Sequence, residues 1–166
     1  MKTDGIDSFI EILNKQLLLN EKLLNLAFEK QDVIKANDVA RLNGIVLEEQ
    51  NIVKEIIFLE KNRAISVENI QRDLGIKKAI TNVKEVVKKV SKDRADKIID
   101  ISTRLRTVLD KLKVQNDLNN ELVKISLDYI DLNVNIFKSM VSNEPKTYGK
   151  KAYENGGDGS IFDSKY

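Results

Sequence analysis

Asn119-Asn120-Glu121-Leu122-Val123-Lys124-Ile125-Ser126-Leu127-Asp128-Tyr129-Ile130 forms the second half of the stretch that decides the fold, which runs from about Ser91 to Val141. Neither glycine nor proline interrupts this stretch, and leucine, isoleucine and valine recur at steps of three and four residues. The pattern predicts a single helix of about 50 residues, roughly 75 Å long. Such a helix must bury its apolar stripe against other long helices, or leave part of it open for a partner.

Composition favours helices over sheets and limits the possible chemistry. Hydrophobic residues make up 42% of the 166 residues, but aromatics only 5%, with no tryptophan, which suits aliphatic helix seams. Because the net charge is only +2, no strong field attracts nucleic acid or an anionic membrane. The absence of both cysteine and histidine excludes disulfides, the usual zinc sites and the usual nucleophile-base pairs.

The start of the chain predicts a soluble protein of the cytoplasm. Residues 1–5 lead directly into an amphipathic pattern without the apolar core of a signal peptide. No later window approaches an apolar run of 18 residues, so we expect no membrane-spanning helix.

Two further helices precede the long one. We expect the first at about residues 5–35 and the second at about 38–62, joined by a short link in which Asn37 or Asp38 caps the second helix. A link this short predicts an antiparallel hairpin. The first helix has two parallel apolar rows and therefore two helical neighbours. Asn20 interrupts one row, either as a register-setting residue or, the interpretation we favour, at a partly solvated edge.

Short helices are expected to connect the hairpin to the long helix. Ser66 can cap a helix at about 66–74 that ends before Gly75, and a weak Asn82–Glu85 capping box opens another turn or two. Together with the long helix, this gives a predicted helical range of about 82–142. Eight basic residues lie between Lys77 and Lys97. A nucleic-acid patch is conceivable there, but a solvated helix face is the favoured interpretation because no aromatic residues are interleaved.

The apolar seam of the long helix changes phase in its middle. Its first part is regular: Ile98, Ile101, Leu105, Val108 and Leu112. The seam is then interrupted by Gln115, Asn116, Asp117, Asn119 and Asn120, and apolar residues resume at Leu118, Leu122, Ile125, Tyr129, Leu132 and Ile136. The shift resembles a stutter and predicts that the two halves face different surroundings.

The C-terminal residues are predicted to form a flexible tail. We place a helical domain at 1–142 and a tail at 143–166, which contains the single proline, few aliphatic residues and three of the four tyrosines. Carboxylate pairs such as Glu48 with Glu49, or Asp128 with Asp131, are interpreted as solvated faces because nothing predicts a second acidic helix opposite them. No phosphate loop or nucleophile elbow is present, so we expect a binding protein without cofactor, metal or catalytic residues.

Three segments together resemble a known family. They are Asn120-x-Leu122-Val123-x-x-Ser126-Leu127-x-Tyr129-Ile130, then Thr147-Tyr148-Gly149, and then Ser160-Ile161-Phe162-Asp163. The chain looks like the FlgN family of flagellar type III export chaperones, which serve the hook-filament junction proteins. The N-terminal hairpin is also similar, with its Asn-Asp link and its Lys61-Asn62-Arg63 end. Gly149 departs from the family, in which a charged residue commonly follows this tyrosine.

The resemblance implies an all-α chaperone that holds the terminal helices of junction proteins in the cytoplasm, prevents premature assembly and delivers them to the export gate. It implies neither a cofactor nor ATP hydrolysis. Our expectation is an elongated, coiled-coil-like helical hairpin or bundle with one very long C-terminal helix and a flexible tail. The alternative is a structural coiled-coil adaptor that self-associates. The residues expected to bind the client are Leu118, Leu122, Ile125, Tyr129, Ile136, Tyr148 and Phe162.

Overall fold

The computed structural model describes residues 4–76 and 83–141, and every regular element within these ranges is a helix. Four helices are described: α1 at Asp4–Lys35, α2 at Val39–Asp73, α3 at Val83–Val87 and α4 at Lys92–Val141. The prediction of an all-α protein with one very long C-terminal helix is confirmed. The described residues fall into two units, which divide after Leu127, so α4 contributes to both. The predicted tail at 143–166 lies outside the described residues, and the boundary after Ser142 stays a prediction.

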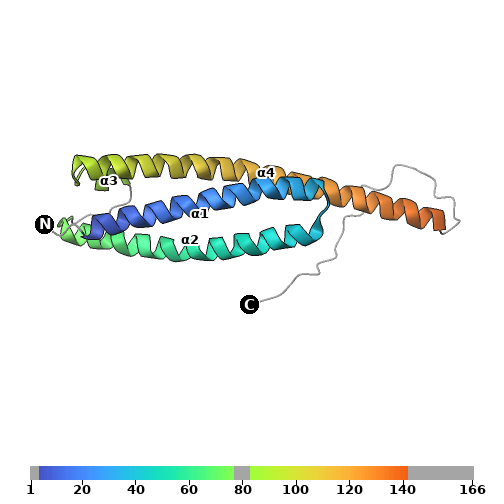
Figure 1. The fold of residues 1–166 in the computed structure, drawn as a ribbon, viewed down its shortest axis with the longest axis horizontal. Coiled ribbons are helices and arrows are strands. Elements are labelled where there is room, and N and C mark those ends of the chain that lie inside the picture. Colours follow the sequence, from blue (N-terminus) through green and yellow to red (C-terminus); the bar gives the residue numbers. More distant parts are fainter. Residues whose placement is uncertain (1–3, 77–82, 142–166) are drawn as a thin grey trace. The chain divides into compact units, whose positions relative to one another are not determined.

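α1 and α2 form the predicted antiparallel hairpin (Figure 1). The link is short because Asn37 takes a left-handed backbone conformation, with φ of 54°, and Asp38 then caps α2. The Asp38 Oδ1 accepts a hydrogen bond from the Arg41 N–H at 2.9 Å, which satisfies one of the free amides of the first turn. Arg41 also forms ion pairs with Glu29 and Glu48, so the same residue ties both helices together at this end.

The predicted break in α2 near residue 62 is absent. α2 continues to Asp73, where Gly75, with φ of 62°, provides the expected left-handed terminus. Ser66, which we expected to cap a new helix, lies buried inside α2 and donates a hydrogen bond to the Gly5 carbonyl of α1 at 3.1 Å. A serine can serve as a cap or as a contact between helices, and here the contact with α1 prevails.

α4 packs on α1 in a parallel orientation within the first unit. Arg94 pairs with Asp7 at 2.7 Å, Arg104 contacts Glu21 at 3.3 Å, and Asn119 donates to the Ala27 carbonyl at 2.7 Å. Residue numbers of these partners thus increase in the same direction along both helices, as expected for parallel packing. Within this unit, α1 lies between α2 and α4 (Figure 1), as its two apolar rows predicted.

The core lies at the end of the bundle where α3 packs. Its buried residues come from all four helices and are Phe9, Leu13, Leu17, Ile70, Val86, Ile98 and Ile101. The predicted range 82–142 is not one continuous helix, because the short α3 is separate from α4. The Lys89 N–H bonds to the Val86 carbonyl at 2.9 Å, a tightened last turn, and α4 begins only at Lys92. Asn82 lies outside the described residues.

Buried polar residues run along α1. Asn20 is buried, so the interpretation as a partly solvated edge is wrong, and its amide donates to the Gln16 carbonyl at 2.8 Å. The Gln16 side chain in turn donates to the Glu60 carboxylate of α2 at 2.9 Å. Arg63 also pairs with Glu60, and mainly this hydrogen bond, with that of Gln16, lowers the pKa of Glu60 below its ordinary value.

The lowered pKa of Glu60 predicts a small loss of stability in acid. A carboxylate whose pKa is lower in the folded state stabilises the fold above its unfolded-state pKa of about 4.3, and this contribution disappears as the pH falls through the lowered folded-state value. We therefore expect Glu60→Gln to lower the melting temperature slightly at pH 7, and the difference from wild type to shrink as the pH falls below about 4.3 and to vanish below the lowered folded-state pKa. Thermal melts of both proteins across this range provide the measurement. A difference that stays constant down to pH 3 would contradict it.

Candidate functional site

The seam between α1 and α4 continues through polar residues. Gln115 and Asn119 are both buried, and they follow Ile98, Ile101, Leu105, Val108 and Leu112 at the same steps of three and four. The predicted interruption of the seam is therefore wrong. The seam stays in contact with α1, but amide residues replace the aliphatic residues along it. Asn119 donates to the Ala27 carbonyl, and Gln115 donates to both Asn119 at 3.2 Å and Gln31 at 3.3 Å.

Because Gln115 and Asn119 occupy the face that contacts α1, most apolar side chains in the following part of α4 lie at exposed positions. Of the predicted site residues in the first unit, Leu118 is exposed, Leu122 is half-buried and Ile125 is 63% exposed. Two residues that the sequence prediction did not include, Val123 and Leu127, are exposed as well. The two halves of α4 have different surroundings, as predicted. The difference arises from the residue types on the seam, however, and not from a shift in helix phase.

In the second unit, residues Asp128–Val141 of α4 carry two apolar rows. Row A contains predicted site residues and consists of Tyr129, Leu132 and Ile136. Row B was not predicted and consists of Ile130, Val134, Phe137 and Val141. Every member of both rows is exposed except Ile136, which is half-buried. The steps of four, three and four residues in row B were a readable signal for a second seam.

The remaining predicted site residues, Tyr148 and Phe162, lie outside the described residues. Their proposed contribution to binding stays a prediction.

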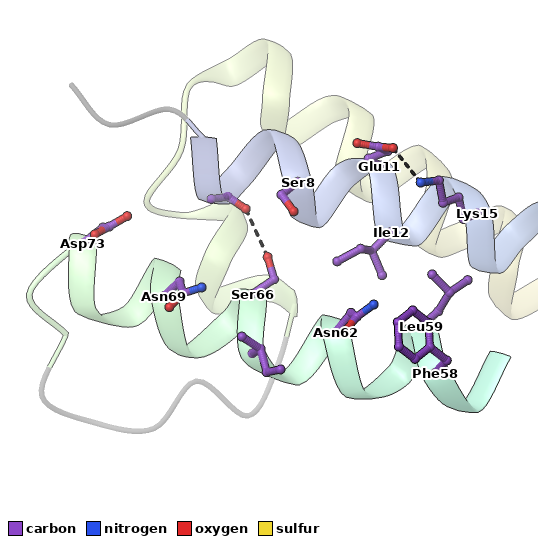
Figure 2. A pocket seen from close by; sticks show the side chains of 12 residues that line it. Ser8, Glu11, Ile12, Lys15, Phe58, Leu59, Asn62, Ser66, Asn69 and Asp73 are labelled. Atoms are coloured by element: carbon purple, nitrogen blue, oxygen red, sulfur yellow. Dashed lines mark hydrogen bonds and ion pairs between the residues drawn. The ribbon is translucent and has the colours of Figure 1, made fainter. Parts of the chain in front are cut away.

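A groove between α1 and α2 offers another exposed apolar surface, in the first unit. It encloses about 760 Å³, and Figure 2 shows Ile12 of α1 opposite Phe58 and Leu59 of α2. Phe58 is 64% exposed. The other end of the groove is polar, with Ser8, Asn62, Ser66, Asn69 and Asp73 (Figure 2). At its edge Lys15 pairs with Glu11 at 2.7 Å, and this hydrogen bond lowers the pKa of the Glu11 carboxyl.

The acidic side chains of the described residues form no cluster suited to metal binding. In residues 4–76 and 83–141, no group of three or more carboxylates could hold a metal ion. Glu49 pairs with Lys30 at 2.6 Å and Glu48 with Arg41 at 2.9 Å, so this acidic pair serves the hairpin. What both surfaces offer chemically is aliphatic and aromatic area at helical spacing, which suits the binding of another helix.

The basic cluster is in part structural. Arg94 pairs with Asp7 of α1 at 2.7 Å, and Lys88, Lys89, Lys92 and Lys97 are exposed. Lys77 and Lys78 lie outside the described residues. Among the described helices, none combines the length and the apolar character that crossing a membrane requires.

The chain is similar to known proteins over most of its length. The chain is 26% identical over 157 residues to the uncharacterised protein YvyG of Bacillus subtilis (strain 168), an alignment that covers 89% of this chain and 96% of the relative. No solved structure matches the chain significantly. A model of the FlgN family, described as FlgN protein, matches residues 1–156. Since this match spans the hairpin and the whole of α4, the chain belongs to the FlgN family, the family of flagellar export chaperones.

Proposed function

We propose that this chain is a cytoplasmic chaperone that binds the terminal helices of hook-filament junction proteins, prevents their premature assembly and delivers them to the flagellar type III export apparatus. The family supports the export role. The observation that supports the binding mode is the exposure of the apolar side chains of α4 beyond Asn119, above all Tyr129 and Phe137.

The proposed mechanism is the docking of an amphipathic client helix on this surface. Monomeric soluble proteins seldom expose so many neighbouring aliphatic and aromatic side chains, and such a surface marks an interaction site. Covering about 500 Å² of it would contribute on the order of 12 kcal/mol before the costs of association and ordering, which reduce this sum severely. A client helix bound in this way cannot use the same apolar face for assembly.

Co-purification with a junction protein tests the proposed function. We expect this chain to form a stable complex with a hook-filament junction protein from the same genome, and size-exclusion chromatography with light scattering to give the mass of a mixed complex. The alternative, a self-associating adaptor, is favoured by the exposed apolar residues of α2, such as Leu47 and Phe58. A stable oligomer of this chain that does not bind the junction protein would contradict the chaperone role and support that alternative.

The residues after Ser142 are expected to contribute to binding but not to folding. The resemblance assigns Tyr148 and Phe162 to the client site, and the composition of residues 143–166 is too polar for a core. Truncation after Ser142 should leave the melting temperature nearly unchanged and weaken the complex with the junction protein. Unfolding of the truncated chain would instead assign these residues to the folded structure.

A further inference from the structure

The apolar surface of Asp128–Val141 is wider than one helix can cover. At 3.6 residues per turn, rows A and B together span about 200° of the helix circumference. Lys138, Asp131, Asn135, Asp128 and Ser139 occupy the remaining arc. All charged residues of this segment lie in that polar arc, and only Asn133 interrupts the apolar one. The partner must therefore present uncharged, apolar side chains to both rows.

A single partner helix cannot reach both rows. The apolar stripe through which a helix contacts one neighbour is about 100° wide. Leu132 of row A and Val134 of row B are two residues apart and therefore project about 160° from each other around the axis. Both side chains are exposed, at 53% and 43%. Two neighbours are needed, as α1 needs both α2 and α4 in the first unit.

We propose that residues Asp128–Val141 bind two helices of one client at the same time, one on row A and one on row B. This inference rests on the proposed chaperone function and specifies its partner: a pair of amphipathic helices from one junction protein, each apolar along one side. Charged residues of the client then lie at the outer edges, next to Asp131 and Lys138 for the helix on row B.

The two opposed rows favour one client with two helices over a second copy of this chain. Rows A and B project to different sides of α4, so a single partner helix covers only one of them. Pairing of α4 with α4 of a second copy would cover one row on each chain and leave the other row exposed.

Site-specific photo-cross-linking tests the proposal. A benzophenone amino acid replaces Leu132 in one variant and Val134 in another, each in the full chain bound to the full-length junction protein, and mass spectrometry identifies the linked peptides. We expect the two positions to link to two different helical segments of the same junction protein. A third variant with the probe at Asn135, an exposed residue of the polar arc, is the control and should give at least 10-fold less product.

The outcomes separate this inference from the proposed function. Links from Leu132 and Val134 to one and the same client segment would overturn the two-helix proposal and leave the chaperone function standing. A link from either position to a second copy of this chain, together with the mass of a chaperone dimer by light scattering, would also overturn it. Absence of client links from both positions, in a chain that keeps its wild-type melting temperature, would overturn the proposed client surface itself.

Discussion

Replacing Leu17 with aspartate is expected to destabilise the protein by several kcal/mol, about 3 to 5 at neutral pH. Leu17 is 2% exposed and belongs to the core cluster in which α1 meets Ile70, Val86 and Ile98. An aspartate there would bury an unpaired carboxylate and also remove the packing of the leucine side chain. Urea unfolding followed by circular dichroism measures the change.

The neighbouring residue provides a matched control. Leu18 has the same side chain on the same helix but is 58% exposed. Leu18→Asp is therefore expected to change the free energy of unfolding by less than about 1 kcal/mol. Equal destabilisation by the two substitutions would contradict the assignment of the α1 core face.

The second large effect concerns α4. We expect the double substitution Tyr129→Ser and Phe137→Ser to weaken junction-protein binding by at least about 100-fold, because exposed aromatic residues that become buried in an interface commonly dominate its binding energy. The two side chains are 63% and 67% exposed and lie in rows A and B. Because both side chains are exposed in the free chain, its melting temperature should stay within a few degrees of wild type. A large fall in melting temperature would show that both side chains stabilise the folded chain, and would contradict the proposed client surface.

Spacing and capping residues predicted the hairpin, its link and the long helix. Three- and four-residue steps report directly on the helix period, and Asn37 and Asp38 were both candidates for the cap, a role that the structure gives to Asp38. Helix ends were less predictable. Ser66 could be read as a cap, and only the position of the Gly5 carbonyl in α1 shows that it serves a contact between helices.

Polar residues within the seams misled the sequence prediction. Asn20, Gln115 and Asn119 were interpreted as edge or interruption because amides are usually exposed. Their burial depends on partners that are distant in sequence, such as the Ala27 carbonyl, which lies 92 residues from Asn119. Periodicity shows that a helix has a buried face, but it does not show that hydrogen bonds to another helix make amides acceptable on that face.

The candidate site could be predicted only in part for a related reason. The sequence indicated row A because its residues were taken to resume the seam after Asn119, yet row B has equally regular spacing. Which apolar rows are covered and which stay exposed depends on the packing of α1 against α4. Exposure therefore had to come from the structure.

Isothermal titration calorimetry of three proteins with the junction protein tests the client surface most directly: wild type, the Tyr129→Ser and Phe137→Ser variant, and a matched Leu47→Ser and Phe58→Ser variant. Leu47 and Phe58 of α2 are 62% and 64% exposed, so this control removes comparable apolar area from the hairpin. We predict that the α2 variant binds like wild type, whereas the α4 variant loses at least about 100-fold in affinity. Wild-type affinity of the α4 variant, with binding lost in the α2 variant, would contradict the account and move the client to the hairpin.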